Sequence, residues 1–341
     1  MKAQAAVFGA SGYAGGELVR LLDSHERFDL SYIGGHSSAG SKLGDVHPHL
    51  PGAGRVLGPN DAGEVSGVDM AFLALPHGAS ADMGAQLAAA GSMVVDLGSD
   101  YRMDTPERYR LAYGSAHPRP DDLGSWVYGL PELFDVRGAR LVASPGCYPT
   151  SVLLALAPLL AAGLVSGDGV VADCLSGVSG AGRSLREDLL YGAVDEGVRA
   201  YGVTVHRHRP EIEMALDSLR GGEHRIVFTP HLVPMQRGIL ATVTAVAADG
   251  VDRSALLGAL EAAYADGLFV EVIEGPPQTR WVVGSNRAMV SAFFDERTGR
   301  VVAQAAIDNL LKGAAGQAVQ AANLMMGFPE GTGLPLAGWM P

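Results

Sequence analysis

The stretch SPGCYPTS, residues 144–151, holds the side chain best suited to nucleophilic chemistry in this chain. Residues 147–160 have a helical pattern with Pro149 in the first turn, where the missing N–H of proline costs nothing. A helix N-terminus lowers the pKa of a thiol and enriches the nucleophilic thiolate. Most free cysteines are small buried apolar residues, and Cys174, in an apolar strand-like segment, fits that description. We therefore predict that Cys147 is the nucleophile.

A nucleophilic thiol needs an acid–base partner, and the densest histidine cluster is VHRHRPEIE, residues 205–213. Glu211 follows His208 by three residues, a spacing that predicts an imidazole oriented by a carboxylate. The alternative is a polar helix start. His206 and His208 are also potential metal ligands, but no third ligand is suitably spaced, so we expect no metal.

A glycine-rich turn follows the first apolar segment. In FGASGYAGGEL, residues 8–18, Gly9, Gly12 and Gly15 form a G-x-x-G-x-x-G variant of the dinucleotide fingerprint. Small residues let the backbone approach a pyrophosphate, and the helix that follows offers free N–H groups and the positive end of its dipole. The turn therefore predicts a dinucleotide site.

The end of the second expected strand distinguishes between the two nicotinamide cofactors. Sites specific for NAD place an acidic residue about 20 residues after the fingerprint, to bind the ribose hydroxyls. Here the chain reads IGGHSSAGSKLG, residues 33–44, without an acid. Ser37, Ser38 and Lys42 could hold a 2′-phosphate instead, and we expect NADP(H).

Three loops are candidate anion sites because each pairs an arginine with hydroxyl, amide or glycine groups. They are SDYR (99–102), SGVSGAGRS (176–184) and PMQRGI (234–239). An arginine fork matches the geometry of phosphate and carboxylate. Each is also compatible with an ordinary loop.

The elements that must position these residues differ between the two halves of the chain. The first half alternates short apolar runs with helical patterns at 16–23 and 79–90, which indicates a parallel sheet. The second half is rich in strands, with helices at 254–265 and 309–327, which indicates a mixed or antiparallel sheet. The expected strands are 3–9, 28–35, 68–76, 92–99 and 139–146, then 169–177, 224–232, 238–247, 287–295 and 300–308.

Length and composition limit the class of protein. A chain of 341 residues indicates two domains. No apolar run reaches the ~18 residues of a membrane span, and the N-terminus lacks a secretory pattern. Two cysteines indicate a reducing, cytoplasmic location, and a net charge of −12 argues against nucleic acid and anionic membranes as partners.

These motifs occur together, and in this order, in a known family. The chain resembles the N-acetyl-gamma-glutamyl-phosphate reductases, NADPH-dependent semialdehyde dehydrogenases of arginine biosynthesis. The matching stretches are GASGYAGGEL, SAGSKLGDVHPHL, LALPHG, DLGSDYR, YGLPEL, SPGCYPTS, SGVSGAGRS, HRHRPEIE, TPHLVPMQRGIL and DNLLKGAAGQAVQAANLMMG. They extend over nearly the whole chain.

The resemblance implies an α/β Rossmann domain of residues 1–146 plus 309–341, which binds NADP. It also implies an α+β catalytic and dimerisation domain of residues 147–308, similar to the C-terminal domain of glyceraldehyde-phosphate dehydrogenase. The substrate would be a small acyl phosphate, and the assembly a homodimer or homotetramer.

The resemblance also implies roles for individual residues. Cys147 would be the nucleophile and His208 the acid–base, with His206 in contact with the substrate. Arg102, Arg183 and Glu211 become candidates for binding the substrate, and Asn309 for holding the nicotinamide carboxamide. The remaining cofactor candidates are Ser11, Tyr13, Ala14, Pro76, Ser179 and Gly180.

Three alternatives remain open at this stage. The first is the same chemistry on a carrier-linked or N-acetylated aminoadipyl or glutamyl phosphate in lysine or ornithine biosynthesis. The second is a thiol acyltransferase or hydrolase that uses Cys147 and His208 without redox chemistry. The third is a non-catalytic NADP sensor. A nicotinamide absorbance assay separates the second from the first.

Overall fold

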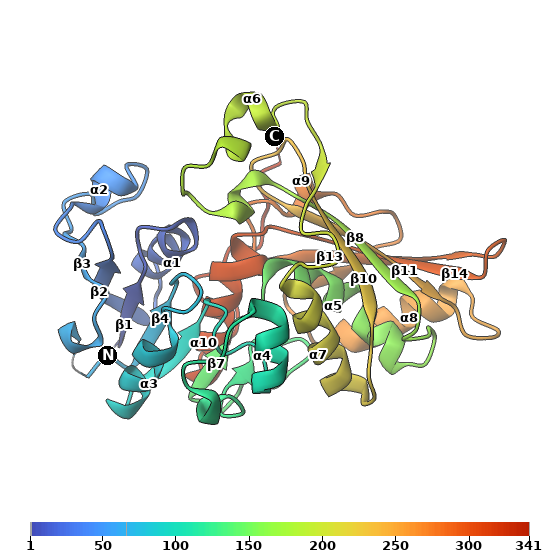
Figure 1. Cartoon of the computed structure of the whole chain (residues 1–341), viewed down its shortest axis with the longest axis horizontal. Helices are drawn as coiled ribbons and strands as arrows, with labels where there is room; N and C mark the ends of the chain where they lie inside the picture. The colour runs from blue at the N-terminus through green and yellow to red at the C-terminus, as the bar shows by residue number, and fades with distance from the viewer. Residues whose placement is uncertain (1, 66, 341) are drawn as a thin grey trace. The chain divides into compact units, whose positions relative to one another are not determined.

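The computed structural model describes residues 2–65 and 67–340, which divide into two compact units. Unit 1 comprises Ser115–Pro145, Ala314–Leu334 and the described residues up to Arg110. Unit 2 comprises Leu111–Gly114, Gly146–Gly313 and the described residues from Pro335 onward. The colour scale of Figure 1 follows the chain through both.

Unit 1 is built on a parallel sheet with the strand order β3-β2-β1-β4-β5-β7-β6. The strands are β1 (Ala3–Phe8), β2 (Phe28–Gly35), β3 (Gly58–Pro59), β4 (Met70–Leu73), β5 (Met93–Asp96), β6 (Val127–Tyr128) and β7 (Leu141–Ala143). All four residues of β4 are buried, as the apolar run predicts for a strand covered on both faces. The strand order reverses between β1 and β4, where open α/β sheets bind their ligands. The predicted Rossmann fold is confirmed.

Helices cover both faces of this sheet. Helix α1 (Tyr13–Asp23) contacts β1 and β2, α3 (Ala81–Ala89) contacts β5, and α10 (Gly316–Met325) contacts α1 and β5. The other helices are the short α2 (Leu43–Val46) and α4 (Pro106–Tyr113), whose last residues belong to unit 2. Helix α1 connects β1 to β2, and α3 connects β4 to β5. Because β2 and β5 lie on opposite sides of the central strands β1 and β4, right-handed crossovers place α1 and α3 on opposite faces of the sheet. Helix α10 packs against α1, and Asn323 Oδ1 lies 3.1 Å from His25 Nε2.

Unit 2 has a mixed sheet with the order β12-β13-β14-β11-β8-β10-β9. Strand β8 pairs parallel to β10 and antiparallel to β11. The strands are β8 (Val170–Ser176), β9 (Arg199–Ala200), β10 (Ile226–Leu232), β11 (Ile239–Val246), β12 (Val270–Val272), β13 (Ala288–Asp295) and β14 (Arg300–Ile307). The predicted α+β domain with a mixed sheet is confirmed.

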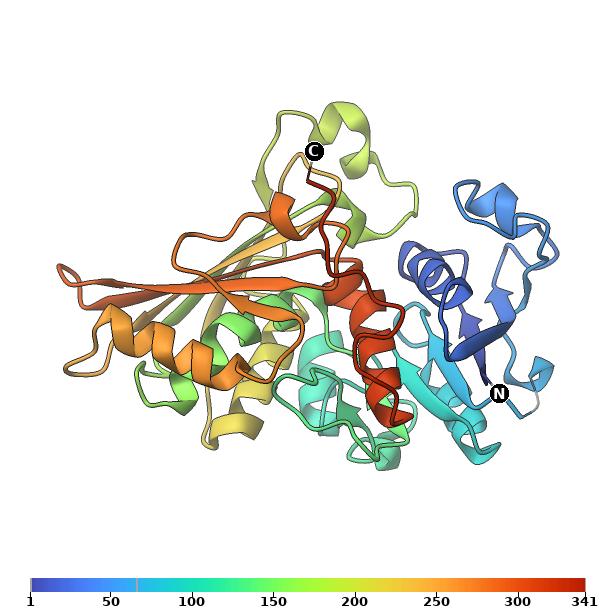
Figure 2. The same ribbon diagram turned by 180° about the vertical axis from the view of Figure 1, so that it is seen from behind.

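The strands of unit 2 bury alternate residues against a layer of helices. Side chains of β8, β10 and β11 alternate between buried and more exposed positions. Helices α5 (Cys147–Ala161), α7 (His208–Arg220) and α8 (Arg253–Tyr264) pack on the same face of the sheet, as Figure 2 shows. The short helices are α6 (Tyr191–Val194) and α9 (Thr279–Val282). None of the helices in the described residues is long and apolar enough to cross a membrane.

The C-terminal helix differs from the prediction of one helix over 309–327. Asp308 instead closes a turn by accepting the N–H groups of Leu310 and Leu311 at 2.8 and 3.1 Å. A π-helical turn, Leu311–Ala315, follows, and α10 begins only at Gly316. The helical backbone runs without a gap from Leu311 to Met325, so the apolar periodicity is borne out, and Asp308 caps its start two residues later than predicted.

Candidate active site

Cys147 is the first residue of α5, and Gly146 is the N-cap. The thiol is partly accessible, whereas Cys174 is fully buried and burial raises the pKa of its thiol. Every residue of α5 from Tyr148 to Leu160 is buried, so packing fixes the position of this helix terminus. The positive end of the helix dipole favours the thiolate of Cys147. The geometry therefore supports the predicted nucleophile.

Cys147 lines a cavity of about 570 Å³ within unit 2. Tyr148, Tyr201, His206 and His208 line it together with Cys147. The charged lining residues are Arg186, Asp188, Arg199 and Arg207. The cavity thus brings the thiol, both predicted histidines and several guanidinium groups to one place.

His208 begins α7 and lies directly beside the residue that precedes the nucleophile. A Cβ atom added at Gly146 would lie 2.5 Å from His208 Nε2 and 2.7 Å from Cε1. Gly146 has an ordinary φ of −66°, so its need for glycine comes from the imidazole and not from backbone strain. The His208 imidazole therefore lies against Gly146, the residue directly before Cys147.

Replacing Gly146 with alanine should therefore displace the imidazole without unfolding the protein. A shift of the catalytic group by about 1 Å costs roughly 10²-fold in turnover, and we expect kcat to fall by about that factor. Steady-state kinetics and the thermal unfolding midpoint measure the two effects. Gly258→Ala is the matched control, since an added Cβ there meets no atom within 4 Å. Unchanged kcat in Gly146→Ala would mean that the position of His208 does not matter.

The two histidines of the cluster have different surroundings. Nδ1 of His206 accepts the backbone N–H of His208 at 3.1 Å. The edges and faces of Tyr148, Tyr201 and Phe228 surround the His206 ring. Burial, with a smaller effect of Arg207, lowers the pKa of His206 to about 4. His206 is therefore neutral at physiological pH and supports the first turn of α7.

Glu211, in the first turn of α7, is fully buried. Its Oε1 accepts the backbone N–H of Gly146 at 2.8 Å. The sequence interpretation linked this carboxylate to the imidazole and overlooked its contact with the turn before the thiol. The polar helix start that was the alternative interpretation of this segment is present, since His208 and Glu211 lie in the first turn of α7.

Asn309 lies in a polar network with Ser179. Its Oδ1 accepts the N–H of Gly238 at 2.7 Å, and its Nδ2 donates to Ser179 Oγ at 3.0 Å. A Cβ added at Gly180 would lie 3.7 Å from the same Nδ2. Three of the predicted cofactor residues, Ser179, Gly180 and Asn309, are thus adjacent.

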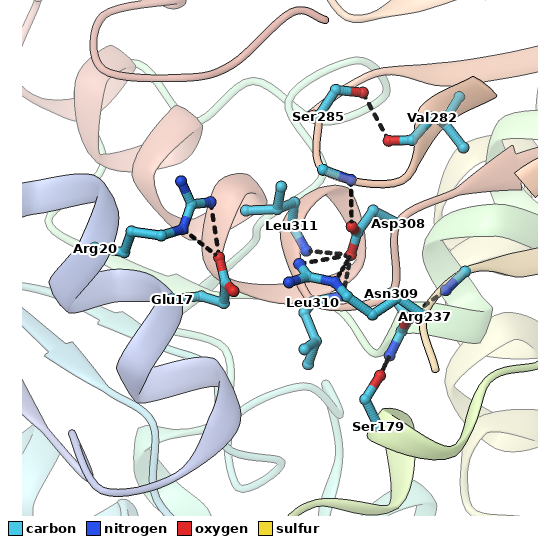
Figure 3. A network of polar contacts seen from close by, with 12 residues as sticks. Glu17, Arg20, Ser179, Arg237, Val282, Ser285, Asp308, Asn309, Leu310 and Leu311 are labelled. Carbon is cyan, nitrogen blue, oxygen red and sulfur yellow. Dashed lines mark hydrogen bonds and ion pairs between the residues drawn. The ribbon is translucent and has the colours of Figure 1, made fainter. Parts of the chain in front are cut away.

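The neighbouring Asp308 anchors this network. Its carboxylate is fully buried and accepts Nε and Nη2 of Arg237 at 3.2 and 3.0 Å. Figure 3 shows Asp308 between Arg237 and the backbone of the following turn. Arg237, singled out in the sequence as an anion site, therefore serves to hold the turn that presents Asn309.

The predicted dinucleotide loop has the close backbone approaches that require glycine. Gly9 has φ +81°, and a Cβ there would lie 2.2 Å from the carbonyl oxygen of Ala74. A Cβ at Gly15 would lie 2.1 Å from the carbonyl oxygen of Gly9. Ser11 and Gly12 form the turn between them, and Tyr13 and Ala14 begin α1.

The other cofactor candidates of unit 1 follow neighbouring strands. Ser37 and Ser38 come after β2, and Pro76 comes after β4. The carboxyl ends of parallel strands β1, β2 and β4 lie at one edge of the sheet, and so do these residues. The loop that holds Ser37, Ser38 and Lys42 is largely exposed, as a phosphate site on the surface needs to be.

The arginine candidates occupy different settings. Arg102 is 9% exposed and donates to the carbonyl oxygens of Ser144 and Leu97 at 2.9 and 2.8 Å. It therefore holds the segment that leads toward Cys147. Arg183 lies exposed in the loop that follows Val178–Ala181.

Two arginines of the cavity were not singled out in the sequence. Arg186 and Arg199 both bind Asp188, with Nη2 of each 2.7 Å from its Oδ2. They are 13 residues apart in the chain and belong to no short motif, so only the folded structure could bring them together. Among the described residues, no group of three or more His, Cys, Asp or Glu side chains is arranged to hold a metal ion.

Comparison with known proteins shows which protein families this chain is similar to. Residues 4–138 match the family model for the semialdehyde dehydrogenase NAD binding domain, and residues 147–309 match the semialdehyde dehydrogenase dimerisation domain. N-acetyl-gamma-glutamyl-phosphate reductase of Arthrobacter sp. (strain FB24) is 48% identical over 100% of both chains. The protein of that name from Synechocystis sp. is 44% identical over 100% of this chain and 99% of its own.

Solved structures show the same fold at lower identity. Aspartate semialdehyde dehydrogenase II of Vibrio cholerae, complexed with ASA, is 18% identical with a TM-score of 0.72, over 95% of this chain and 98% of that one. Aspartate semialdehyde dehydrogenase with NADP from Candida albicans is 17% identical with a TM-score of 0.68, over the same 95% and 98%.

Proposed function

The chain belongs to the semialdehyde dehydrogenase family, and on that premise we propose that it reduces N-acetyl-gamma-glutamyl phosphate with NADPH. The products are N-acetyl-glutamate semialdehyde and phosphate, in arginine biosynthesis. The observation that carries the proposal is the accessible thiol at the N-terminus of α5, which shares a cavity with His208. The identity of 48% over the full length of a reductase of that name supports the choice of substrate.

The chemistry follows from the residues of the cavity. The Cys147 thiolate attacks the carbonyl carbon of the acyl phosphate, and phosphate leaves as the thioester forms. NADPH, when bound, supplies the hydride that reduces this thioester. His208 gives a proton to the oxygen as the carbonyl is reduced, and takes it back when the aldehyde forms and the C–S bond breaks.

The residues of unit 1 fit a dinucleotide. The cradle at Gly9 and Gly15 leaves no room for a Cβ, and the N-terminus of α1 follows it. Ser11, Gly12, Tyr13 and Ala14 would hold the pyrophosphate. Ser37 and Ser38, with the exposed Lys42, would hold the 2′-phosphate of NADP(H), because no acid takes the place of the ribose ligand.

The remaining assignments form part of the same proposal. His206, Glu211, Arg102 and Arg183 are proposed to bind or position the substrate, and Pro76, Ser179, Gly180 and Asn309 the nicotinamide side of the cofactor. The proposed cofactor domain is residues 1–146 plus 309–341, and the proposed catalytic and dimerisation domain is residues 147–308. The two compact units differ from these bounds, because Leu111–Gly114, Gly146, residues 309–313 and the described residues from Pro335 onward group with unit 2. We further propose that the protein is a homodimer or homotetramer, which the match to a dimerisation domain supports. We also propose that it works in the cytoplasm.

The function is tested most directly in reverse. With N-acetyl-glutamate semialdehyde and phosphate, the enzyme should reduce NADP⁺ at least about tenfold more efficiently than NAD⁺, as expected for one charge-assisted phosphate contact. Absorbance of the reduced nicotinamide measures both rates. The same assay with the aminoadipate homologue, one methylene longer, should lose about tenfold in kcat/KM, because a pocket discriminates a methylene by that order.

Each arm of the assay has an outcome that contradicts the proposal. Equal efficiency with NADP⁺ and NAD⁺ would remove the role of Ser37, Ser38 and Lys42. A preference for the aminoadipate homologue, or for a carrier-linked substrate, would favour lysine biosynthesis. The absence of any nicotinamide reduction, with thiol-dependent hydrolysis in its place, would favour a hydrolase.

A further inference from the structure

A fully buried cluster of two carboxyl groups and one hydroxyl lies between the end of β5 and the start of α3 in unit 1. Asp96, Asp100 and Ser80 each have no exposed surface. Ser80 Oγ lies 3.0 Å from Asp96 Oδ2 and 3.0 Å from Asp100 Oδ2. The cluster is outside the cavity that holds Cys147, and the proposed mechanism does not use it.

The hydrogen count of this cluster is informative. A serine hydroxyl carries one proton, so it can donate to only one of the two carboxyl oxygens. If both carboxyls were ionised, the second contact would set a hydroxyl lone pair against a negatively charged oxygen in a buried site. A proton on one of the carboxyl groups, donated to Ser80 Oγ, removes this repulsion and gives both 3.0 Å contacts a hydrogen.

The contacts identify which carboxyl is protonated. Asp100 accepts the backbone N–H groups of Gly78, Ser80 and Ala81 at 2.7, 3.0 and 3.0 Å, and His77 Nδ1 lies 3.2 Å from it. Several donors of this kind stabilise a charged carboxylate. Asp96 accepts one backbone N–H, that of Gly98 at 2.7 Å.

We propose that Asp96 is a neutral carboxylic acid at mildly acidic pH, loses its proton as the pH rises through neutrality, and acts as a positioning residue for cofactor binding. It donates to Ser80, which donates to the Asp100 carboxylate, and this chain of hydrogen bonds fixes the turn of residues 76–81. That turn carries Pro76, one of the residues assigned to the cofactor. The role in cofactor binding rests on the proposed function, whereas the protonation state of Asp96 does not.

The electrostatic surroundings agree with this assignment. Burial, and next the charge of Asp100, raise the pKa of Asp96 to about 7, against smaller opposing effects of the Gly98 amide, Arg102 and Ser80. The other titratable groups around the pair are His77, Tyr101 and Tyr109. Burial and the nearby Asp100 and Asp96 carboxyls raise the pKa of Tyr109 to about 12, so it stays neutral.

The same strand end also supports the segment that leads to the nucleophile. The backbone oxygen of Asp96 accepts the N–H of Ser144 at 2.7 Å, and Arg102 holds the carbonyl oxygens of Ser144 and Leu97. The fit is tight, since a Cβ at Gly98 would lie 2.6 Å from Ser80 Oγ. A charge on Asp96 would therefore disturb both the 76–81 turn and its support.

Infrared spectroscopy tests the protonation state without any assay of activity. The wild-type protein at pH 6 should show the carbonyl band of a buried carboxylic acid, which disappears by about pH 9 and is absent from Asp96→Asn at both pH values. The unfolding free energy gives a second readout. Between about pH 4 and pH 7 the folded protein keeps this proton while the unfolded chain, with the ordinary pKa of 3.8, has lost it, so folding weakens as pH rises. Asp96→Asn should lack that component.

Kinetics tests the role in positioning. In the wild-type enzyme the KM for NADPH should rise above pH 7, because Asp96 loses its proton there. The asparagine amide can donate to Ser80 as the acid does, so Asp96→Asn should keep this KM within about twofold and should lack the rise above pH 7. Ser80→Ala should raise that KM about tenfold, because it leaves buried polar groups without partners. Ser92→Ala is the control, since Ser92 is also buried and bonds to the Val68 carbonyl oxygen at the other end of β5.

The infrared and kinetic measurements test the protonation of Asp96 and its positioning role separately. A wild-type infrared spectrum without the acid band at pH 6, or one identical to that of Asp96→Asn, overturns the protonation of Asp96. An infrared result as expected, with a KM for NADPH that rises equally with pH in wild type and Asp96→Asn, overturns the positioning role alone. An inactive wild-type protein with the expected infrared band would count against the proposed function and leave the acid assignment standing.

Discussion

Replacing Cys147 with serine is expected to lower the turnover number by roughly 10⁴-fold or more, the order seen when a catalytic nucleophile is removed. The helix terminus that favours a thiolate cannot ionise a serine hydroxyl, whose pKa is far higher, so no covalent intermediate forms. NADPH affinity should change by less than about twofold, because the proposed cofactor loop belongs to residues 9–15 and 37–42. Steady-state kinetics measures the first effect, and a binding titration the second.

Cys174→Ala is the matched control for this variant. Cys174 is fully buried in β8, so its loss should reduce stability through a small cavity and leave the mechanism intact. Near-wild-type turnover of Cys147→Ser would rule out the covalent mechanism. Inactivity of both variants at equal folded fraction would show that the assay does not report on the nucleophile.

The main elements of the fold could be predicted because their signals are local. The strands β1, β2, β8, β10, β11, β13 and β14 follow the apolar runs within about two residues. The short strands β3, β6, β9 and β12 were missed, since two or three residues carry no periodicity and depend on the neighbouring strand. The start of the C-terminal helical segment at Leu311 depends on the Asp308 carboxylate, which periodicity does not register.

The candidate site also combines features of single short segments with contacts between distant segments. Cys147 at a helix start and the glycines of the dinucleotide loop could be predicted, because both are properties of a short segment. The bond from Gly146 to Glu211 joins residues 65 apart, and Arg186 meets Arg199 only through Asp188. Contacts of this kind depend on how α5, α7 and the loop after β8 pack, which no single segment specifies.

The second large effect is expected at His208. Its imidazole lies against Gly146, beside the nucleophile, whereas His206 is held by the N–H of His208 and is neutral because burial lowers its pKa to about 4. A group that titrates so far below physiological pH is a poor proton donor at neutral pH. The surroundings therefore favour His208 as the acid–base and His206 as its support.

His208→Asn should reduce kcat by about 10²–10⁴-fold, the usual range for the loss of general acid–base catalysis. The helix N-terminus and the bond from Gly146 to Glu211 do not involve the imidazole, so the thiolate of Cys147 should persist. Iodoacetamide should therefore still label Cys147 at neutral pH in this variant, at a reduced rate, and mass spectrometry of the labelled peptide measures it. His206→Asn is the comparison and should cost less in turnover. A larger loss in His206→Asn would reverse the assignment of the pair, and losses below tenfold in both would place the base outside residues 206–211.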